Sequence, residues 1–571
     1  MDPTPYLELK PAARVLFDSA AQHGDNARFM LQVAGDWQPV TWRQHAQAVR
    51  EVACGLRALG IEPGERGAVF SPNRVAWMEA ALGLGAAQAV MVPVYPSNTA
   101  EQLAYVVGHA DAAVVFVDTA ALVTRLRTAW PNIAHTVRHV VVFDSIVATG
   151  TQEFSDEMAS RTLSLAQLRQ LGSQWDTDNA QLFQSGLESI ALDDIGIMLY
   201  TSGTSGNPKG VPLTHRNVGT NGRDWLVCNG PQVEVGDVDL LWLPMSHIFG
   251  FGEACLGNTL GFTSYLCEPQ EVLVRLPEVK PQVLMSVPLI WEKLAQFAAN
   301  SADPRAGLRE ITGGRLRFCL SGGAGLKREV KEFFADAGLL ILEGYGLTEA
   351  SPTLTLNRPD AYRFDSVGKP LPSVELRLAA DGEIMARGPS IFGGYHKDPA
   401  ATEAIFDAEG WLMTGDVGRW TADGFLQIID RKKDILVTSG GKNVPPANIE
   451  QQFADEPLIA QAVVYGDGKS FLVAGLWPNT LMIPILLAEF APADRPAEVH
   501  RRLAAKVAEV NAMLAKHETI KRFALMPNSL SVEGGQLTPT LKVKRKRVCE
   551  EFRSEFEALY LQPHTVGSTA A

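Results

Sequence analysis

The sequence has few of the features that mark secreted, zinc-binding or nucleic-acid-binding proteins. Its six cysteines form no CxxC pair and no metal-ligand spacing, which favours a reduced, cytoplasmic setting. The opening residues, MDPTPYLELK, contain no apolar core, so no secretory signal is expected. Since 51 Lys and Arg face 64 Asp and Glu, the net charge of −13 argues against a nucleic-acid partner.

Long hydrophobic runs are also scarce, and only residues 471–490 approach the length of a membrane span. Pro478, Asn479 and Pro484 interrupt this run. Its first part, FLVAGLW, predicts a buried strand that is followed by a turn and a helix. No transmembrane segment is therefore expected, while peripheral membrane contact and the oligomeric state stay open.

At 571 residues the chain is too long for one ordinary core, so at least two domains are expected. Helical and strand patterns alternate between residues 41 and 119, which predicts parallel sheets flanked by helices. Closely spaced glycines in residues 407–429 indicate a small β-rich unit. After the charged segment DRKKDI, residues 433–571 are enough for a small α+β domain, with a helix at 496–516.

The strongest chemical signal is the loop in residues 199–211, LYTSGTSGNPKGV. Successive backbone N–H groups and hydroxyls suit phosphate oxygens, and Lys209 adds a positive charge. Pro208 precedes this lysine, so the loop is not a Walker A motif. A flexible surface linker is the alternative, but apolar segments on both sides favour phosphate binding. The predicted phosphate-binding residues are Thr201, Ser202, Gly203, Thr204, Ser205, Gly206 and Lys209.

A second motif, EGYGLTE, occupies residues 343–349. Glycines on both sides of Tyr345 would let backbone approach a flat ligand, and the ring offers a stacking face. Glu349 is a hard oxygen ligand suited to Mg²⁺, and the Thr348 hydroxyl can bind a phosphate. A tight turn with a buried tyrosine is the alternative. The residues that we expect to bind the nucleotide here are Glu343, Gly344, Tyr345, Gly346 and Thr348.

Three further residues carry charges suited to a nucleotide or to its activation. Asp416 lies in a Thr-Gly-Asp turn, where a carboxylate can accept hydrogen bonds from vicinal ribose hydroxyls. Arg431 presents a planar donor fork to sugar or phosphate. Lys542 follows Thr-Pro-Thr-Leu and opens the basic run KVKRKR, the rest of which is either a solvated face or a contact for CoA phosphates.

Together these motifs resemble the adenylate-forming superfamily, which includes acyl-CoA synthetases, luciferases and peptide-synthetase adenylation domains. The loop at 199–211, EGYGLTE, the segment WLMTGD at 411–416, DRKKD at 430–434 and LTPTLK at 537–542 stand in the family's order. The resemblance implies an α/β fold. Its large N-terminal domain, 1–432, contains stacked α/β subdomains and a small β-barrel, and a small mobile α+β domain, 433–571, follows.

The resemblance also implies roles for individual residues. Lys542, Thr348 and Glu349 would be catalytic, with Lys542 bridging the carboxylate and the α-phosphate. Thr201 and Glu349 would bind Mg²⁺, Gly323 would contact the nucleotide, and Lys433 would be the hinge. Here Leu541 replaces the glycine that many relatives carry before the lysine, and Val437 and Thr438 replace a lysine that often follows the hinge.

Three segments resemble those of long-chain acyl-CoA synthetases. They are SVPLIWEK at 286–293, VTSGGKNVPP at 437–446 and PMSHIFGF at 244–251, which would place His247 and Phe251 in the acyl pocket. Leu289 departs from the usual arginine. The expected activity is ATP-dependent ligation of a fatty acid to coenzyme A through an acyl-adenylate. The alternatives are a fatty acyl-AMP ligase that loads a carrier protein and a catalytically silent acyl- or nucleotide-binding protein.

Overall fold

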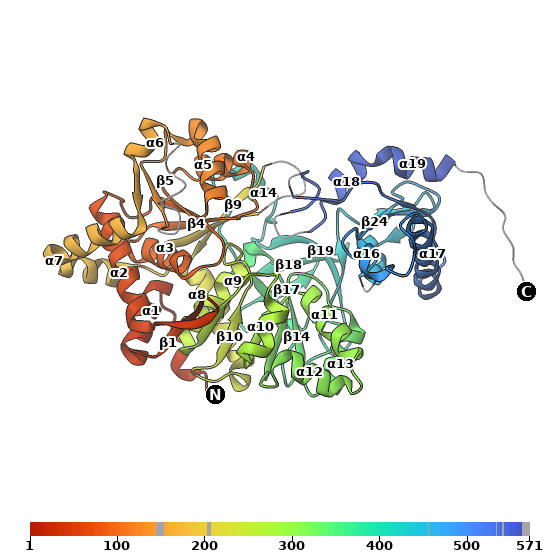
Figure 1. The fold of residues 1–571 in the computed structure, drawn as a ribbon, viewed down its shortest axis with the longest axis horizontal. Coiled ribbons are helices and arrows are strands. Elements are labelled where there is room, and N and C mark those ends of the chain that lie inside the picture. Colours follow the sequence, from red (N-terminus) through yellow and green to blue (C-terminus); the bar gives the residue numbers. More distant parts are fainter. Residues whose placement is uncertain (144–153, 202–206, 455, 533, 539–541, 562–571) are drawn as a thin grey trace, which may run out of the picture. The chain divides into compact units, whose positions relative to one another are not determined.

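The computed structural model describes residues 1–143, 154–201, 207–454, 456–532, 534–538 and 542–561 (Figure 1). The chain divides into two compact units. The larger unit contains residues 1–377, 385–414 and 420–427, and the smaller unit contains 378–384, 415–419 and the chain from 428 onward. The smaller unit thus includes three short segments, 378–384, 415–419 and 428–432, that a single cut after residue 432 would assign to the first domain.

A seven-stranded sheet in the larger unit has the order β7-β6-β5-β3-β4-β8-β9. Neighbouring strands run parallel, except that β8 and β9 pair antiparallel at one edge. This confirms the parallel sheet that the alternating pattern predicts. The strands are β3 (Arg66–Phe70), β4 (Val90–Val94), β5 (Ala112–Val117), β6 (His139–Val142), β7 (Thr162–Ser164), β8 (Ile195–Thr201) and β9 (Lys209–Thr214).

A nine-stranded sheet in the same unit has the order β16-β15-β14-β13-β12-β10-β11-β1-β2. Its middle strands are parallel, and antiparallel pairs close both edges. The strands are β1 (Ala27–Val33), β2 (Asp36–Thr41), β10 (Val238–Leu241), β11 (Thr263–Leu266), β12 (Val283–Ser286), β13 (Phe318–Ser321), β14 (Ile341–Gly346), β15 (Thr353–Leu356) and β16 (Lys369–Pro370).

Helices of the larger unit often begin where a hydroxyl side chain caps the first turn. Thr41, Thr99, Ser164 and Thr214 each form a capping box, so two backbone N–H groups are satisfied reciprocally. The helices are α1 (Ala12–His23), α2 (Trp42–Ala58), α3 (Val75–Ala86), α4 (Ala100–His109), α5 (Ala120–Ile133), α6 (Asp156–Ser160), α7 (Leu165–Ser189), α8 (His215–Asn229), α9 (Ile248–Leu260), α10 (Val272–Val279), α11 (Pro288–Ala299), α12 (Pro304–Thr312), α13 (Arg328–Asp336) and α14 (Pro399–Glu403).

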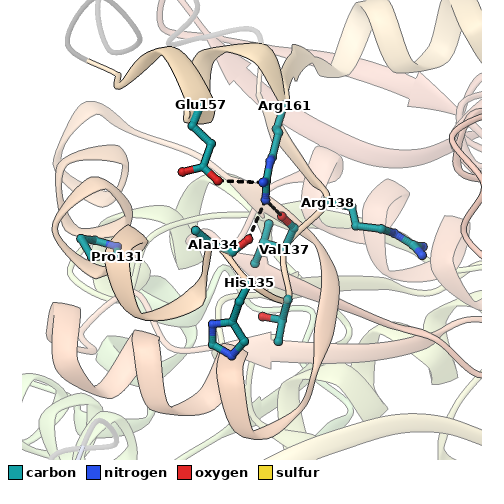
Figure 2. Close-up of a pocket in the computed structure, with 8 residues that line it drawn as sticks. Pro131, Ala134, His135, Val137, Arg138, Glu157 and Arg161 are labelled. Carbon is teal, nitrogen blue, oxygen red and sulfur yellow. Dashed lines mark hydrogen bonds and ion pairs between the residues drawn. The ribbon is translucent and has the colours of Figure 1, made fainter.

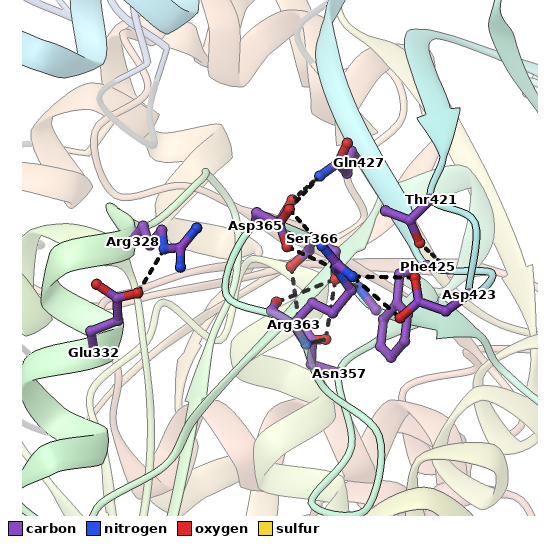
Figure 3. Close-up of polar contacts among 11 residues, drawn as sticks. Arg328, Glu332, Asn357, Arg363, Asp365, Ser366, Thr421, Asp423, Phe425 and Gln427 are labelled. Carbon is purple, nitrogen blue, oxygen red and sulfur yellow. Dashed lines mark hydrogen bonds and ion pairs between the residues drawn. The ribbon is translucent and has the colours of Figure 1, made fainter. Parts of the chain in front are cut away.

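A four-stranded sheet, with the order β17-β18-β19-β20, stands where the sequence predicts the small β-rich unit. Its turn after residue 420 is fastened to the loop that follows β15 (Figure 3). Arg363 donates to Asp365 and to Asp423, and Gln427 Nε2 donates to Asp365 Oδ2 over 2.8 Å. The strands are β17 (Glu375–Leu378), β18 (Glu383–Arg387), β19 (Leu412–Trp420) and β20 (Leu426–Arg431).

The smaller unit contains a three-stranded sheet with the order β23-β24-β25 and the two-stranded pair β21-β22. The run at 471–490 forms β24, a turn and α16, as expected, and the described residues include no helix long and apolar enough to cross a membrane. The elements are β21 (Leu436–Val437), β22 (Asn443–Val444), β23 (Ile459–Tyr465), β24 (Leu472–Pro478), β25 (Ile520–Leu525), α15 (Pro446–Glu450), α16 (Ile483–Leu486), α17 (Arg495–Met513), α18 (Arg545–Glu551) and α19 (Arg553–Leu561).

Helices α2 and α7 pack with almost no space between their backbones. A Cβ atom on Gly172 would lie 1.8 Å from the carbonyl oxygen of Glu51, and one on Gly55 would lie 2.4 Å from the carbonyl oxygen of Leu168. Real Cβ atoms do not approach a carbonyl oxygen so closely, so glycine at both positions permits the contact. On the same helices Arg50 donates two hydrogen bonds to Asp176, over 2.7 and 2.8 Å.

We therefore expect Gly172→Ala to destabilise the larger unit. The added methyl forces the two helices apart, and such overpacking costs about 1–3 kcal/mol. Gly186→Ala on the same helix is the control, because a Cβ there would meet only the Gln88 side chain at 3.6 Å. Since alanine favours helix by about 1 kcal/mol over glycine, this control should not lower the thermal midpoint. Equal midpoints for the two variants would contradict the packing argument.

Candidate active site

The predicted phosphate loop closes a hairpin between β8 and β9. Thr201, at the end of β8, lies opposite Lys209, at the start of β9, in an antiparallel register. The predicted residues Ser202, Gly203, Thr204, Ser205 and Gly206 lie outside the described residues. Because β8 also pairs in parallel with β4, the two ends of the loop are fixed to the seven-stranded sheet.

Glu349 and Lys209, which are distant in the sequence, meet at the side chain of Tyr395. Glu349 lies in the short 3-10 helix η4 (Thr348–Ala350) and is only 9% exposed. The Tyr395 hydroxyl donates to Glu349 Oε1 over 2.8 Å, and Lys209 Nζ lies 4.6 Å from the centre of the Tyr395 ring. A lysine suited to phosphate and a carboxylate suited to a hard cation are thus joined through one aromatic ring.

Strand β14 carries the first half of EGYGLTE. Its glycines make room for neighbouring parts of the chain, not for a flat ligand as the sequence suggested. A Cβ on Gly346 would lie 1.8 Å from the Pro352 carbonyl oxygen, and one on Gly344 would lie 3.0 Å from Leu356 Cδ1. The room that these glycines provide is therefore taken up by the returning chain and β15. The ring of Tyr345, which is partly buried, remains the predicted stacking surface for the base.

The carboxylate of Glu343 lies in the core rather than at a surface. Glu343 is 3% exposed and forms an ion pair with Lys331, while Leu326 N donates to Glu343 Oε1 over 3.0 Å. Burial raises the pKa of Glu343, and the nearby Lys331 ammonium opposes this shift. The pair fixes the loop after β13, where Gly323 has a φ of +86° that favours glycine.

In the smaller unit the structure brings together three predicted site residues, Asp416, Arg431 and Lys542. Arg431 Nε lies 2.9 Å from Asp416 Oδ1, and the Asp416 side chain is nearly buried. The Lys542 N–H donates to Thr538 Oγ1 over 3.0 Å. Although Lys542 is exposed, desolvation by its neighbours and the charge of Arg431 lower its pKa, against the attraction of Asp416.

The expected hinge region follows β20 and is densely bonded on one side. Lys432 Nζ lies 2.7 Å from Glu383 Oε2, and Gly415 N donates to Glu383 Oε1 over 2.9 Å. Hydrogen bonds from Lys432 to Asp381, which makes the largest contribution, and to Glu383 raise the pKa of Lys432. Lys433 is exposed at the next position.

The basic run after Lys542 is only partly a solvated face. Arg545 forms an ion pair with Glu450 and donates to the Val464 carbonyl, while Arg547 lies 3.3 Å from Glu551. Lys546 is exposed, and Lys544 stands at the start of α18. Arg545 therefore holds the smaller unit together, and any contact with CoA phosphates would fall to its neighbours.

The predicted acyl-pocket residues lie at the start of α9. His247 caps this helix by accepting a hydrogen bond from Phe249 N at Nδ1, over 3.1 Å. Phe251 is buried, and its ring meets Trp77 edge-on with centroids 6.1 Å apart. Phe249 lies against Gly322, where a Cβ would come within 3.1 Å of its ring. Two positions apart on the helix, these rings have different neighbours: Phe249 lies beside the loop that contains Gly323, and Phe251 packs against α3.

A hollow of about 590 Å³ lies elsewhere in the larger unit, at the C-terminal end of α5 (Figure 2). Arg161 lines it, but its guanidinium already bonds Glu157 and the carbonyl oxygens of Ala134 and Val137 (Figure 2). None of the predicted site residues lines this hollow. The geometry around Glu349 is therefore a better guide to the chemistry than this surface depression.

Two family descriptions match the chain, and together they cover most of it. Residues 16–396 match "AMP-binding enzyme", and residues 433–564 match "AMP-binding enzyme C-terminal domain". The chain belongs to the AMP-binding enzyme family. The first match contains Lys209, Glu349 and Tyr395, and the second contains Lys542.

Relatives of this AMP-binding enzyme extend over its full length. It is 32% identical to the long-chain-fatty-acid–CoA ligase FadD15 of Mycobacterium bovis, over 98% of both chains. It is 26% identical to the long-chain-fatty-acid–CoA ligase ACSBG1 of Bos taurus, over 94% of this chain and 83% of the relative.

Solved structures agree on the fold. The A-PCP didomain of a carboxylic acid reductase from Segniliparus rugosus, in complex with AMP, has a TM-score of 0.78 at 21% identity, covering 97% of this chain and 82% of the other. An O-succinylbenzoate coenzyme A synthetase from Bacillus subtilis, in complex with ATP and magnesium, has a TM-score of 0.69 at 20% identity, covering 93% and 98%. The expected fold, with a large α/β domain and a smaller C-terminal domain, is confirmed.

Sequence reasoning missed two residues that organise this AMP-binding enzyme's site. Lys331 neutralises Glu343, and Tyr395 joins Glu349 to Lys209. Lys331 lies on α13 with no motif around it. Tyr395 follows a pair of glycines in FGGYHKD, where a glycine-aromatic turn was a usable signal.

Glu343→Gln should therefore act mainly on stability. It leaves the buried Lys331 ammonium unpaired, and breaking a buried pair costs about 3–5 kcal/mol. Glu332→Gln, on the same helix as Lys331, is the control. The pair of Glu332 with Arg328 (Figure 3) is exposed, so it contributes at most about 1 kcal/mol. Thermal melting compares the two variants. A Glu343→Gln protein that melts normally but binds ATP poorly would instead make Glu343 a nucleotide ligand.

Proposed function

We propose that this enzyme ligates a fatty acid, of the long-chain class, to coenzyme A at the expense of ATP, through an acyl-adenylate. The observation that carries the proposal is the full-length similarity to long-chain-fatty-acid–CoA ligases. The cluster of Lys209, Tyr395 and Glu349 supports it, because it places a phosphate-binding cation beside a carboxylate. The products are acyl-CoA, AMP and pyrophosphate.

In the first step the fatty carboxylate attacks the α-phosphate of ATP. Lys209 and the backbone of its hairpin would hold the outer phosphates, and Thr348 would donate to a phosphate oxygen. Asp416 would accept hydrogen bonds from the ribose hydroxyls, beside Arg431. Lys542 would act electrostatically, as an ammonium that neutralises charge building on the carboxylate and the α-phosphate.

We propose Mg²⁺ as the metal, because oxygen donors are those it prefers. Thr201 and Glu349 are the donors that fit. The Tyr395 bond uses one acceptor position of the Glu349 carboxylate, which has about four in all. Mg²⁺ bound there would supply charge neutralisation for the phosphates.

For the acyl chain we propose an apolar wall to which Phe251 contributes, with His247 at the start of the same helix. The N-cap bond fixes the His247 ring, so its orientation is set before substrate arrives. Each methylene buried against such a wall contributes about 0.8 kcal/mol, which favours longer chains. Loading of a carrier protein and a purely binding role are the less favoured alternatives.

In the second step the CoA thiol attacks the acyl-adenylate and displaces AMP. We propose that Lys433 is the hinge about which the C-terminal domain, residues 433–571, rotates between the two steps. Such a rotation would replace Lys542 at the reacting centre and limit hydrolysis of the intermediate. The cysteine pattern of the sequence supports a cytoplasmic setting for this reaction.

The proposed activity is tested directly with purified enzyme. ATP, Mg²⁺, CoA and fatty acids of increasing length should yield acyl-CoA, with kcat/KM rising along the series, up to about fourfold per methylene. Acetate and an aromatic acid are the controls. A higher kcat/KM for either control than for every fatty acid would overturn the substrate class, and acyl-adenylate that reacts with a carrier protein but not with CoA would overturn the acceptor.

The alkaline limb of the adenylation rate should report the ionisation of Lys542. The ammonium is the active form, so the rate falls as pH rises through its pKa, which desolvation and the charge of Arg431 lower. Arg431→Gln removes a positive charge nearby, so the pKa should rise and the limb should move to higher pH. The measurement is pyrophosphate release against pH.

Arg501→Gln is the matched control, because Arg501 is an exposed arginine in an ion pair with Glu498 on α17. Its alkaline limb should coincide with that of the unaltered enzyme. A limb that stays in place in Arg431→Gln, or moves to lower pH, would exclude Lys542 as the group that titrates.

A further inference from the structure

Residues 391–397 form a strap that follows β18 and precedes α14. Main-chain hydrogen bonds tie it to two parts of the predicted nucleotide site. Phe392 N donates to the Glu349 carbonyl oxygen, and His396 N donates to the Gly210 carbonyl oxygen, each over 2.9 Å. The strap therefore connects the turn that carries Glu349 with the strand that begins at Lys209.

The side chain of Tyr395 makes the same connection. Its hydroxyl donates to Glu349 Oε1 over 2.8 Å, while its ring lies under Lys209 Nζ at 4.6 Å. A hydrogen bond to a carboxylate fixes the rotation of that carboxylate, and a ring under an ammonium fixes the end of a flexible lysine. One tyrosine thus orients two charged groups of opposite sign without competing with either for its ligand.

The strap is itself anchored, so Tyr395 has little freedom to move. Tyr395 N donates to Thr402 Oγ1 over 2.9 Å, and its ring meets Phe392 edge-on at 5.0 Å. Two residues further along the chain, Lys397 Nζ lies 2.6 Å from Asp111 Oδ2. On the other side, a Cβ on Gly210 would lie 3.1 Å from His396 Cβ, so the strap and β9 are in close contact.

We propose that Tyr395 is a positioning residue for adenylation, which presents the Glu349 carboxylate to the metal–nucleotide complex and holds Lys209 in place for the phosphates. This inference rests on the proposed function, because it assigns a role within that reaction. Tyr395 acts through Glu349 and Lys209 rather than on the reacting atoms.

The test is calorimetric binding of ATP, with Mg²⁺ and with EDTA, to the full chain. Tyr395→Phe keeps the ring and removes only the hydroxyl. Its Kd for Mg·ATP should rise about tenfold, as expected for the loss of a hydrogen bond to a charged group, while its Kd for ATP in EDTA should change less than about twofold. Tyr395→Leu also removes the ring under Lys209, so it should weaken binding of ATP in EDTA as well.

Two controls separate positioning from a general structural effect. Tyr362→Phe removes the hydroxyl of an exposed tyrosine in the same unit and should leave both Kd values unchanged. In a Glu349→Ala background, Tyr395→Phe should have no further effect on Mg·ATP, because its partner is already absent. In steady state the KM for ATP should rise while the KM for the fatty acid stays constant.

The inference is overturned if Tyr395→Phe weakens ATP equally with and without Mg²⁺, or if its effect persists in the Glu349→Ala background. It is also overturned if the unaltered enzyme binds Mg·ATP and Tyr395→Phe binds it equally well. An unaltered enzyme that binds Mg·ATP but makes no acyl-CoA would instead refute the proposed function alone. Because Tyr395→Phe removes a single hydroxyl, its thermal midpoint provides the check that it is folded.

Discussion

The antiparallel pairing of β8 with β9 is the constraint on which the site in the larger unit depends. It places Thr201 opposite Lys209, and β8 is in turn held by its parallel neighbour β4. The lysine is therefore fixed to a buried sheet by main-chain hydrogen bonds, which no side-chain motion can alter. Tyr395 and its strap contact Lys209 and Gly210, so the same pairing fixes their positions as well. If the two ends of this loop were not paired as strands, the same residues would not hold Lys209 in a fixed position.

Glycine stands beside Tyr345 because another part of the backbone, rather than a ligand, lies close to it. The chain turns back after η4, and the Pro352 carbonyl accepts a hydrogen bond from Leu347 N over 2.9 Å. This return brings Pro352 against Gly346 at a distance that leaves no room for a side chain. The close return is what sets Glu349 at the end of β14, next to the strap. The glycines in EGYGLTE thus serve the site indirectly, through the position that they allow for the carboxylate.

Periodicity and motifs predicted much of this structure from the sequence, and they failed where distant contacts decide. The helix predicted at 496–516 is α17, and its apolar residues Val499, Leu503, Val507 and Val510 are buried. The partner of Glu343 could not be predicted, because Lys331 lies on another element and carries no motif. Tyr395 had a turn signal of its own, but its bond to Glu349 could not be predicted, since it joins segments that only the strand order brings together. Secondary-structure propensity depends on a residue and its neighbours along the chain, whereas these two contacts form only when the whole sheet has folded.

The pairing of Asp416 with Arg431 bears on how a ribose could bind in the smaller unit. The Arg431 side chain is half exposed, and ion pairs of that kind contribute at most about 1 kcal/mol. An ion pair of this strength can be exchanged for bonds to ribose hydroxyls at little cost, so it is no obstacle to the nucleotide role that we propose for Asp416. The charge of Arg431 also acts on Lys542, because desolvation and this charge together lower the pKa of the Lys542 ammonium. The residues that we propose for the ribose and for the α-phosphate are in this way coupled through a single arginine.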